Sequence, residues 1–183
     1  MTPSLRCFVA LWPDPRARAE LDVLSHRLQE QHPRARRMRR ENLHLTLAFI
    51  GELAEPSAQR VAAALAALQS TPFTWTLDEV GGFARARVVW AGGHEPRLAG
   101  LARESRECLD RLEVAYDRKP FVAHVTLLRD VIDVPGVARV APIEWHVDRP
   151  VLVVSERGLR GAIRYRTWGA GEPDVSAETA DGP

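Results

Sequence analysis

The chain has 183 residues, 45% of them hydrophobic, which is enough to build the core of one domain or of two small lobes that share a core. Its 25 basic and 24 acidic residues leave a net charge of +1, so composition gives no sign of a strongly basic surface made for nucleic acid. The first apolar run, residues 8–12, is too short for a signal peptide or a membrane span, so we expect a cytoplasmic protein.

The first third of the chain alternates strands with helices. Residues 6–11 predict a strand, and the Pro-Asp-Pro segment at 13–15 predicts a helix start, because proline suits a first turn and aspartate caps it. The leucine stripe of this helix ends before Pro33. A second strand is predicted over 43–50, and a second helix begins at Pro56.

The rest of the chain is richer in strands. Leucines at helical spacing predict a helix over about residues 96–116. Strands are predicted over 73–77, 87–91, 121–128, 143–147, 151–155 and 163–168. Because the regular βαβ alternation of a parallel sheet is missing, we expect an α+β fold with largely antiparallel sheets and helices on the outside. We expect residues 1–168 to form this one domain and 169–183, poor in large apolar residues, to form a flexible tail.

One short pattern occurs twice. His44-Leu-Thr-Leu and His124-Val-Thr-Leu both read His-apolar-Thr-Leu within predicted strands. Side chains two positions apart on a strand share a face, so His44 and Thr46 point one way and their apolar neighbours the other. The same holds for His124 and Thr126. Two copies in one chain indicate two lobes related by a pseudo-two-fold, with the four polar side chains converging on a cleft.

This set of side chains suits the opening of a cyclic phosphodiester. The reaction needs a base for water and an acid for the departing ribose oxygen on opposite sides of the phosphorus. Imidazole titrates near neutral pH, and threonine hydroxyls can donate to the phosphate oxygens. A single His-x-Thr is a weak signal, whereas a repeated polar pair on an otherwise apolar strand is costly without a function. No metal or cofactor is needed, although two histidines could also bind a metal.

The repeat and its surroundings resemble the 2H phosphoesterase superfamily. The segments 6–10, 41–51, 87–90 and 120–130 are similar to the bacterial and archaeal RNA 2',3'-cyclic phosphodiesterases, also called LigT-like 2'-5' RNA ligases. The resemblance covers about residues 5–168. It implies a bilobal α+β fold with a central cleft, and hydrolysis of an RNA 2',3'-cyclic phosphate to a 2'-phosphomonoester, with reversible 2'-5' ligation as a secondary activity.

The resemblance also implies roles for single residues. His44 would be the proton donor to the leaving 3' oxygen and His124 the proton acceptor that activates water. Arg129 would bind the phosphate, although strand alternation places it on the opposite face from His124 unless a bulge intervenes. Phe8 is a candidate to stack on a base, although an aromatic residue in a first strand is more often core. Phe49 faces the same alternation problem as Arg129, and we interpret it as core.

The remaining features are weaker. A loop before the first motif contains Arg34, Arg36, Arg37, Arg39 and Arg40, which could guide RNA or be only a solvated loop. Cys7 and Cys108 lack metal or disulfide spacing, so we expect buried thiols. His26, His32, His94 and His146 have no motif around them and are expected to be surface or structural residues.

Other functions stay open at this point. The same residues could act on a small cyclic nucleotide or an ADP-ribose cyclic phosphate, the chain could grip RNA ends without turnover, or it could be a metal-dependent hydrolase. The expected partner is RNA ending in a 2',3'-cyclic phosphate, with no membrane partner, and we expect a monomer because no coiled coil or exposed apolar segment demands a dimer.

Overall fold

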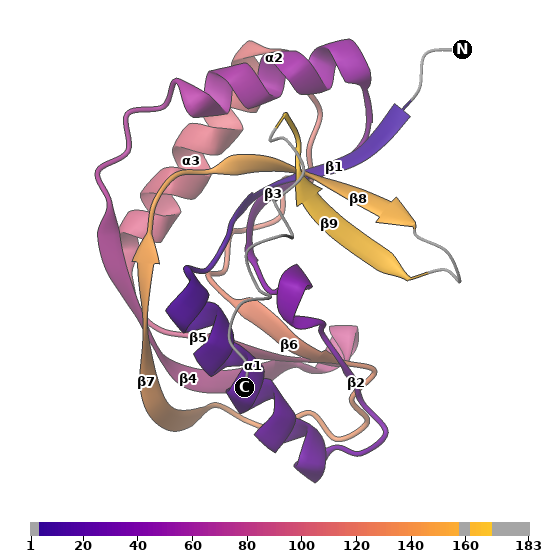
Figure 1. The fold of residues 1–183 in the computed structure, drawn as a ribbon, viewed down its shortest axis with the longest axis vertical. Helices are drawn as coiled ribbons and strands as arrows, with labels where there is room; N and C mark the ends of the chain where they lie inside the picture. Colours follow the sequence, from indigo (N-terminus) through magenta and orange to yellow (C-terminus); the bar gives the residue numbers. More distant parts are fainter. Residues whose placement is uncertain (1–3, 158–161, 170–183) are drawn as a thin grey trace, which may run out of the picture.

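The computed structural model describes residues 4–157 and 162–169, which form the predicted α+β fold of antiparallel strands and outer helices (Figure 1). The helices are α1 (Pro15–Gln31), α2 (Glu55–Ala66) and α3 (Pro96–Arg111), with a short 3-10 turn η1 (Arg40–Asn42). The strands are β1 (Ser4–Leu11), β2 (Arg36–Arg37), β3 (Leu45–Ala54), β4 (Phe73–Phe83), β5 (Val88–Gly92), β6 (Val125–Arg129), β7 (Ala138–Val147), β8 (Val151–Arg157) and β9 (Ile163–Thr167). Nearly all of the tail predicted at 169–183 lies outside the described residues.

The sheet has two halves that meet in the middle. Its strand order is β7-β4-β5-β6-β3-β1-β8-β9, and β2 pairs with the free part of β6. All pairs are antiparallel. In the part of the chain that the structure describes, the halves β7-β4-β5-β6 and β3-β1-β8-β9 are joined only where Leu45 pairs with Val125. β7 and the β8-β9 hairpin therefore lie at opposite ends (Figure 1). Each motif contributes one strand to this junction.

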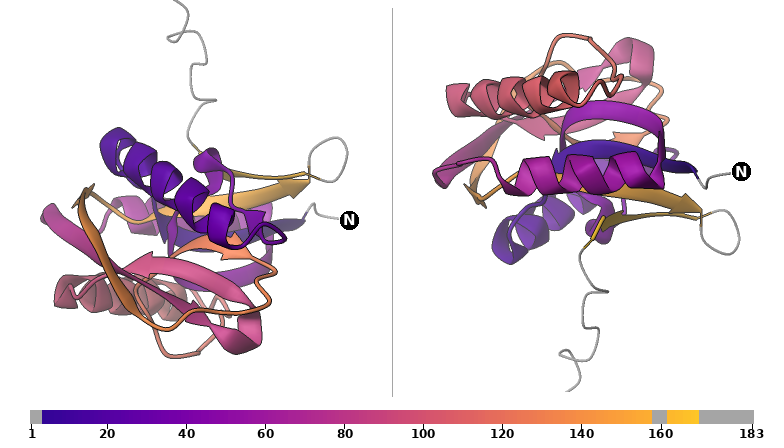
Figure 2. Two further views of the ribbon diagram at one scale, coloured as in Figure 1. Left: turned by 90° about the horizontal axis from the view of Figure 1, so that it is seen from below. Right: turned by 90° about the horizontal axis from the view of Figure 1, so that it is seen from above.

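The helices tie the two halves together. α1 follows β1 in the chain but packs against β6 and β7 of the other half, whereas α3 follows β5 but packs against β3 and α2. The two helices consequently lie on opposite sides of the molecule (Figure 2). Asp14 caps α1 as predicted, because its Oδ1 accepts from the amides of Arg16 and Ala17 at 3.0 Å.

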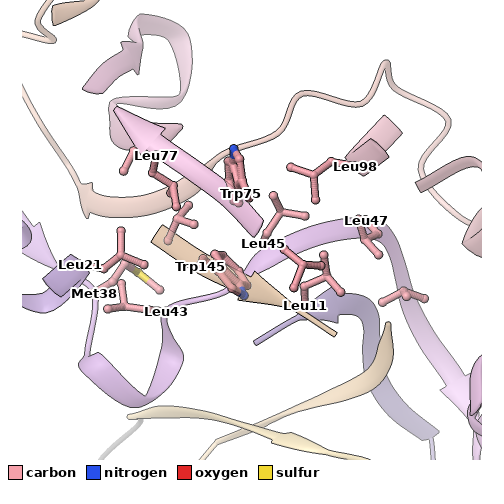
Figure 3. Close-up of a cluster of buried hydrophobic side chains, with 14 of the residues drawn as sticks. Leu11, Leu21, Met38, Leu43, Leu45, Leu47, Trp75, Leu77, Leu98 and Trp145 are labelled. Carbon is pink, nitrogen blue, oxygen red and sulfur yellow. The ribbon is translucent and has the colours of Figure 1, made fainter. Parts of the chain in front are cut away.

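One hydrophobic core runs through both halves. Trp75 and Trp145, neither with any exposed surface, pack with ring centroids 5.3 Å apart among leucines from β1, β3 and the helices (Figure 3). Cys7 and Cys108 are buried, as expected, and burial raises the pKa of the Cys7 thiol to about 11. Because the leucines of both motif strands belong to this core, the polar face of each motif is held at a fixed place on the other side of the sheet.

Several elements differ from the prediction. The strands predicted over 43–50 and 121–128 begin only at Leu45 and Val125, after the motif histidines, and β7 begins at Ala138, before the predicted 143. β4 continues through Gly81 to Phe83, since a Cβ at Gly81 would lie 2.5 Å from the Trp90 ring, and only glycine lets that ring cross the strand. α3 ends at Arg111 because Glu113 adopts a left-handed conformation, with φ of 57°. The arginine-rich loop contains β2, which pairs with β6. Among the described residues, no helix is long and apolar enough to span a membrane.

Candidate active site

The two motif histidines lie on one face of the sheet where β3 meets β6. His44 and His124 each immediately precede their strand, and the next residues, Leu45 and Val125, form the bridge pair. In an antiparallel arrangement the flanking residues share one face, so the two imidazoles lie on the same side of the sheet. Besides burial, the charge of His124 helps to lower the pKa of His44, as expected of close neighbours. Both rings are partly buried.

The two threonines complete a square on this face. Extending the bridge register places His44 opposite Thr126 and Thr46 opposite His124. Nε2 of His44 lies 3.0 Å from Oγ1 of Thr46, so the hydroxyl can donate to the neutral ring. The predicted convergence of all four side chains is therefore what the fold produces.

Both imidazoles are oriented in the same way. Nδ1 of His44 lies 2.7 Å from the carbonyl oxygen of Asn42, and Nδ1 of His124 lies 2.7 Å from that of Val122. A carbonyl oxygen can only accept, so each Nδ1 carries a proton. In each neutral ring Nε2 is therefore unprotonated, and it is the atom that can take a proton from a ligand.

The environment favours the neutral form of both histidines. Burial lowers the pKa of His44 from 6.5 to about 4, and the charges of Arg129 and His124 lower it further. The hydrogen bond to the Asn42 carbonyl acts in the opposite direction. Burial, followed by the charge of Arg129, lowers the pKa of His124, while the Val122 carbonyl opposes it. A bound anion would offset the burial and the repulsion, so this face is electrostatically suited to a phosphate.

A bulge in β6 brings Arg129 to the site. The consecutive residues Val89 and Trp90 pair with Leu128 and Thr126, which leaves Leu127 as one extra residue. An extra residue reverses the alternation beyond it, so Arg129 shares the face of Thr126. Its charge acts on both histidines, in agreement with this placement. β6 therefore contains the bulge that is needed to bring Arg129 to the same face as His124.

β3 has the same bulge, and it overturns our interpretation of Phe49. Consecutive residues of β1 pair with Thr46 and Ala48, leaving Leu47 unpaired. Phe49 therefore shares the face of Thr46 and is 39% exposed, not core as predicted. The guanidinium of Arg6 lies 5.5 Å from its ring centroid. Phe49 is thus the pseudo-symmetric counterpart of Arg129.

Aromatic rings hold the two imidazoles. The ring of His44 is 4.9 Å from that of Phe8, 5.2 Å from Tyr165 and 6.0 Å from Trp12. The ring of His124 meets the Phe83 ring edge-on at 4.9 Å. Only 4% of Phe8 is exposed, so its ring packs against His44 and has little surface left on which a nucleotide base could stack. The structure thus favours the core interpretation of Phe8 over base stacking.

Asn42 is a site residue that the sequence did not single out. It is buried, its amide donates to the carbonyl of Ile163 at 2.9 Å, and its Oδ1 accepts from the amide of Tyr165 at 3.2 Å. Its own carbonyl binds His44. Asn42 therefore fixes the first histidine to β9. Only its place in the first motif segment could have drawn attention to it.

The arginine-rich loop is mostly neutralised within the protein. Arg36 pairs with Asp130, Arg37 with Asp22, and Arg39 approaches Glu41 at 3.9 Å. This leaves Arg34 and Arg40 without an ion pair in the described part of the chain. Elsewhere, no three His, Cys, Asp or Glu side chains gather as metal ligands would within residues 4–157 and 162–169. His26 and His146 are exposed residues of α1 and β7, in keeping with a surface or structural role.

Comparison with known proteins places this arrangement in a family. The family described as LigT like Phosphoesterase matches residues 11–90. The RNA 2',3'-cyclic phosphodiesterase of Escherichia coli K12 is 39% identical over 92 residues, which cover 49% of this chain and 52% of that protein. The RNA 2',3'-cyclic phosphodiesterase of Thermotoga maritima is 29% identical over 163 residues, 79% of this chain and 83% of that protein. Several of these matches, including the first, span about half the length of the curated relative.

Solved structures show the same fold over nearly the whole chain. E. coli LigT complexed with 3'-AMP superposes with a TM-score of 0.78 and 30% identity, covering 90% of this chain and 95% of that one. The protein TT0787 of Thermus thermophilus superposes with a TM-score of 0.72 and 27% identity, covering 90% of this chain and 95% of that one. The predicted α+β arrangement is confirmed by these neighbours.

Proposed function

Because the chain belongs to the LigT-like phosphoesterase family, we propose that it hydrolyses a terminal 2',3'-cyclic phosphate of RNA to a 2'-phosphomonoester without a metal. The observation that carries this proposal is the pair of imidazoles held on one face of the sheet, each with Nδ1 against a carbonyl oxygen and an unprotonated Nε2. The names of the curated relatives, RNA 2',3'-cyclic phosphodiesterases, support the same substrate.

Each site residue has its own role in the proposed reaction. Nε2 of His124 takes a proton from water, whose oxygen attacks the phosphorus, and Nε2 of His44 gives a proton to the departing 3' oxygen. Thr46 and Thr126 donate to the non-bridging oxygens, and Arg129 adds a positive charge beside them. Opening of the ring leaves the phosphate on the 2' oxygen. Use of a 5'-hydroxyl in place of water would form a 2'-5' linkage, which is the ligase activity of the same site.

The electrostatics bear on which histidine is the acid. In the free protein burial lowers the pKa of His44 to about 4, so Nε2 of His44 holds no proton at neutral pH. The role of His44 as donor therefore depends on the bound phosphate, whose negative charge raises the pKa of both rings. A substrate with sulfur as the 3' leaving atom needs no acid, so it should restore activity to His44→Ala and not to His124→Ala. Rescue of His124→Ala alone would reverse the two roles.

The direct test is incubation with an oligoribonucleotide that ends in a 2',3'-cyclic phosphate, in excess EDTA. We expect conversion to the 2'-phosphate, resolved from the 3'-phosphate by chromatography. A 3'-phosphate product would keep the two-histidine chemistry but change the leaving oxygen. Activity that disappears in EDTA and returns with added metal would contradict the metal-free mechanism. Sedimentation of the same sample tests the expected monomer.

A further inference from the structure

Arg18, on the first turns of α1, has no ion-pair partner among the described residues and lies near the active site. Its guanidinium lies 5.7 Å from the ring centroid of Trp12, and the Trp12 ring lies 6.0 Å from that of His44. Trp12 is itself fixed, because its Nε1 donates to Oγ1 of Thr167 at 2.9 Å. Arg18 and the imidazole of His44 therefore both lie close to the same ring, that of Trp12.

The hydrogen-bonding capacity of Arg18 is largely unused. Within the described residues its buried Nε has no hydrogen-bond partner, and Nη2 makes only a long bond, 3.4 Å, to the carbonyl of Pro13. An unsatisfied buried donor on a cation is costly unless a ligand completes it. Burial and the charge of Arg40 both lower the pKa of Arg18.

Arg40 brings a second positive charge to the same place. It lies on η1, which packs against α1 and β9, and it has no ion pair in the described part of the chain. The carboxylates of Asp14 and Glu41 raise the pKa of Arg18, but each of them also binds other groups. Asp14 accepts from the amides of Arg16, Ala17 and His146, and Glu41 approaches Arg39. The charges of Asp14 and Glu41 oppose the repulsion between Arg18 and Arg40, but neither carboxylate forms an ion pair with Arg18 or Arg40 in the described part of the chain.

We propose that Arg18 and Arg40 form a second phosphate subsite, which binds the phosphodiester on the 5' side of the terminal nucleotide. This inference rests on the proposed function, because it takes the cyclic phosphate to lie at His44 and His124. A phosphate placed between the two guanidinium groups would satisfy the free donors and cancel the repulsion. The subsite selects a nucleotide that carries phosphate at both ends, as in an RNA chain, over a simple cyclic mononucleotide.

The test compares three substrates of increasing phosphate content. These are a nucleoside 2',3'-cyclic phosphate with a 5'-hydroxyl, the same nucleotide with a 5'-phosphate, and a dinucleotide ending in the cyclic phosphate. We expect kcat/KM to rise with the added phosphate, and the double variant Arg18→Gln, Arg40→Gln to lower the ratio of dinucleotide to 5'-hydroxyl substrate by roughly 10- to 100-fold. A dinucleotide with a neutral methylphosphonate linkage should lose the same advantage.

Arg27→Gln is the matched control. Arg27 is exposed on the same helix, nine residues beyond Arg18 and so on its opposite side, at 100° per residue. Removing it lowers the net charge by one, as Arg40→Gln does, and should leave the substrate ratio as in the wild type. Arg40→Gln alone, at an exposed residue, should give part of the effect without risk to folding.

The outcomes separate this inference from the proposed function. If the wild type hydrolyses the substrates but the double variant keeps the wild-type ratio, the subsite is refuted and the activity stands. A 5'-phosphate that helps as much as the full dinucleotide would support the subsite and show that a terminal phosphate suffices. If the wild type hydrolyses none of them, the proposed function fails. In that case the subsite is tested by binding: fluorescence anisotropy measures the affinity of the wild type and of the double variant for an oligoribonucleotide ending in a 3'-phosphate. Equal affinities would refute the subsite.

Discussion

Leu45 and Val125 form the pair through which the two halves of the sheet are joined. Each is the first residue of its strand, and each directly follows a motif histidine. The core therefore fixes the spacing of the two imidazoles, because both partners of this pair are fully buried. The backbone geometry of the active site is thus a consequence of how the halves pack, and single changes to the polar side chains should leave it intact.

The first prediction concerns the two histidines. We expect His44→Ala and His124→Ala each to reduce kcat on a cyclic-ended oligoribonucleotide by about 10²- to 10⁴-fold, the usual contribution of one positioned acid or base. The double variant should lose much less than the product of the two, since acid and base act in one step. Circular dichroism checks that the variants stay folded. Near-wild-type turnover by either single variant would exclude the two-histidine mechanism.

The sequence predicted the four central side chains because their placement follows from the two-residue period of a strand. It could not place Arg129 and Phe49, because each lies beyond a bulge. The bulges at Leu47 and Leu127 depend on the register with neighbouring strands β1 and β5, which local sequence does not encode. Asn42 was missed for a similar reason, since its partners on β9 are 121 and 123 residues away.

The second prediction is an acidic pH optimum for kcat/KM. The reaction needs one proton shared by the pair, and kcat/KM reports the pKa values of the free enzyme. Since His44 has its pKa lowered to about 4 and His124 has its pKa lowered below 6.5, activity should rise as pH increases through about 4 and fall as pH approaches 6.5. A profile of initial rates at low substrate measures both limbs. An optimum above pH 7 would show that the imidazoles are not buried as described.

The third prediction uses Arg129, whose charge adds to burial in lowering the pKa of both histidines. Arg129→Gln should shift the whole kcat/KM profile toward higher pH, because removal of a positive charge stabilises the imidazolium forms. It should also lower the maximum, since the phosphate loses a charged donor. Arg129→Lys is the control, since it keeps the charge and should leave the profile nearly in place. A loss of rate in Arg129→Gln without any shift would place its charge away from the histidines.

The fourth prediction contrasts two phenylalanines that face each other across β1 and β3. Phe8 is 4% exposed and Phe49 is 39% exposed, although they are directly paired in the register. We expect Phe8→Ala to lower the free energy of unfolding by about 3–5 kcal/mol, as for other buried aromatics, and to loosen the ring beneath His44. Phe49→Ala should cost about 1 kcal/mol or less, because its ring is already open to solvent. Urea denaturation of both variants measures the difference, and Phe8→Leu serves as the milder core change. Equal losses at the two positions would mean that Phe49 packs in the core after all, and the bulge at Leu47 would then have to be absent.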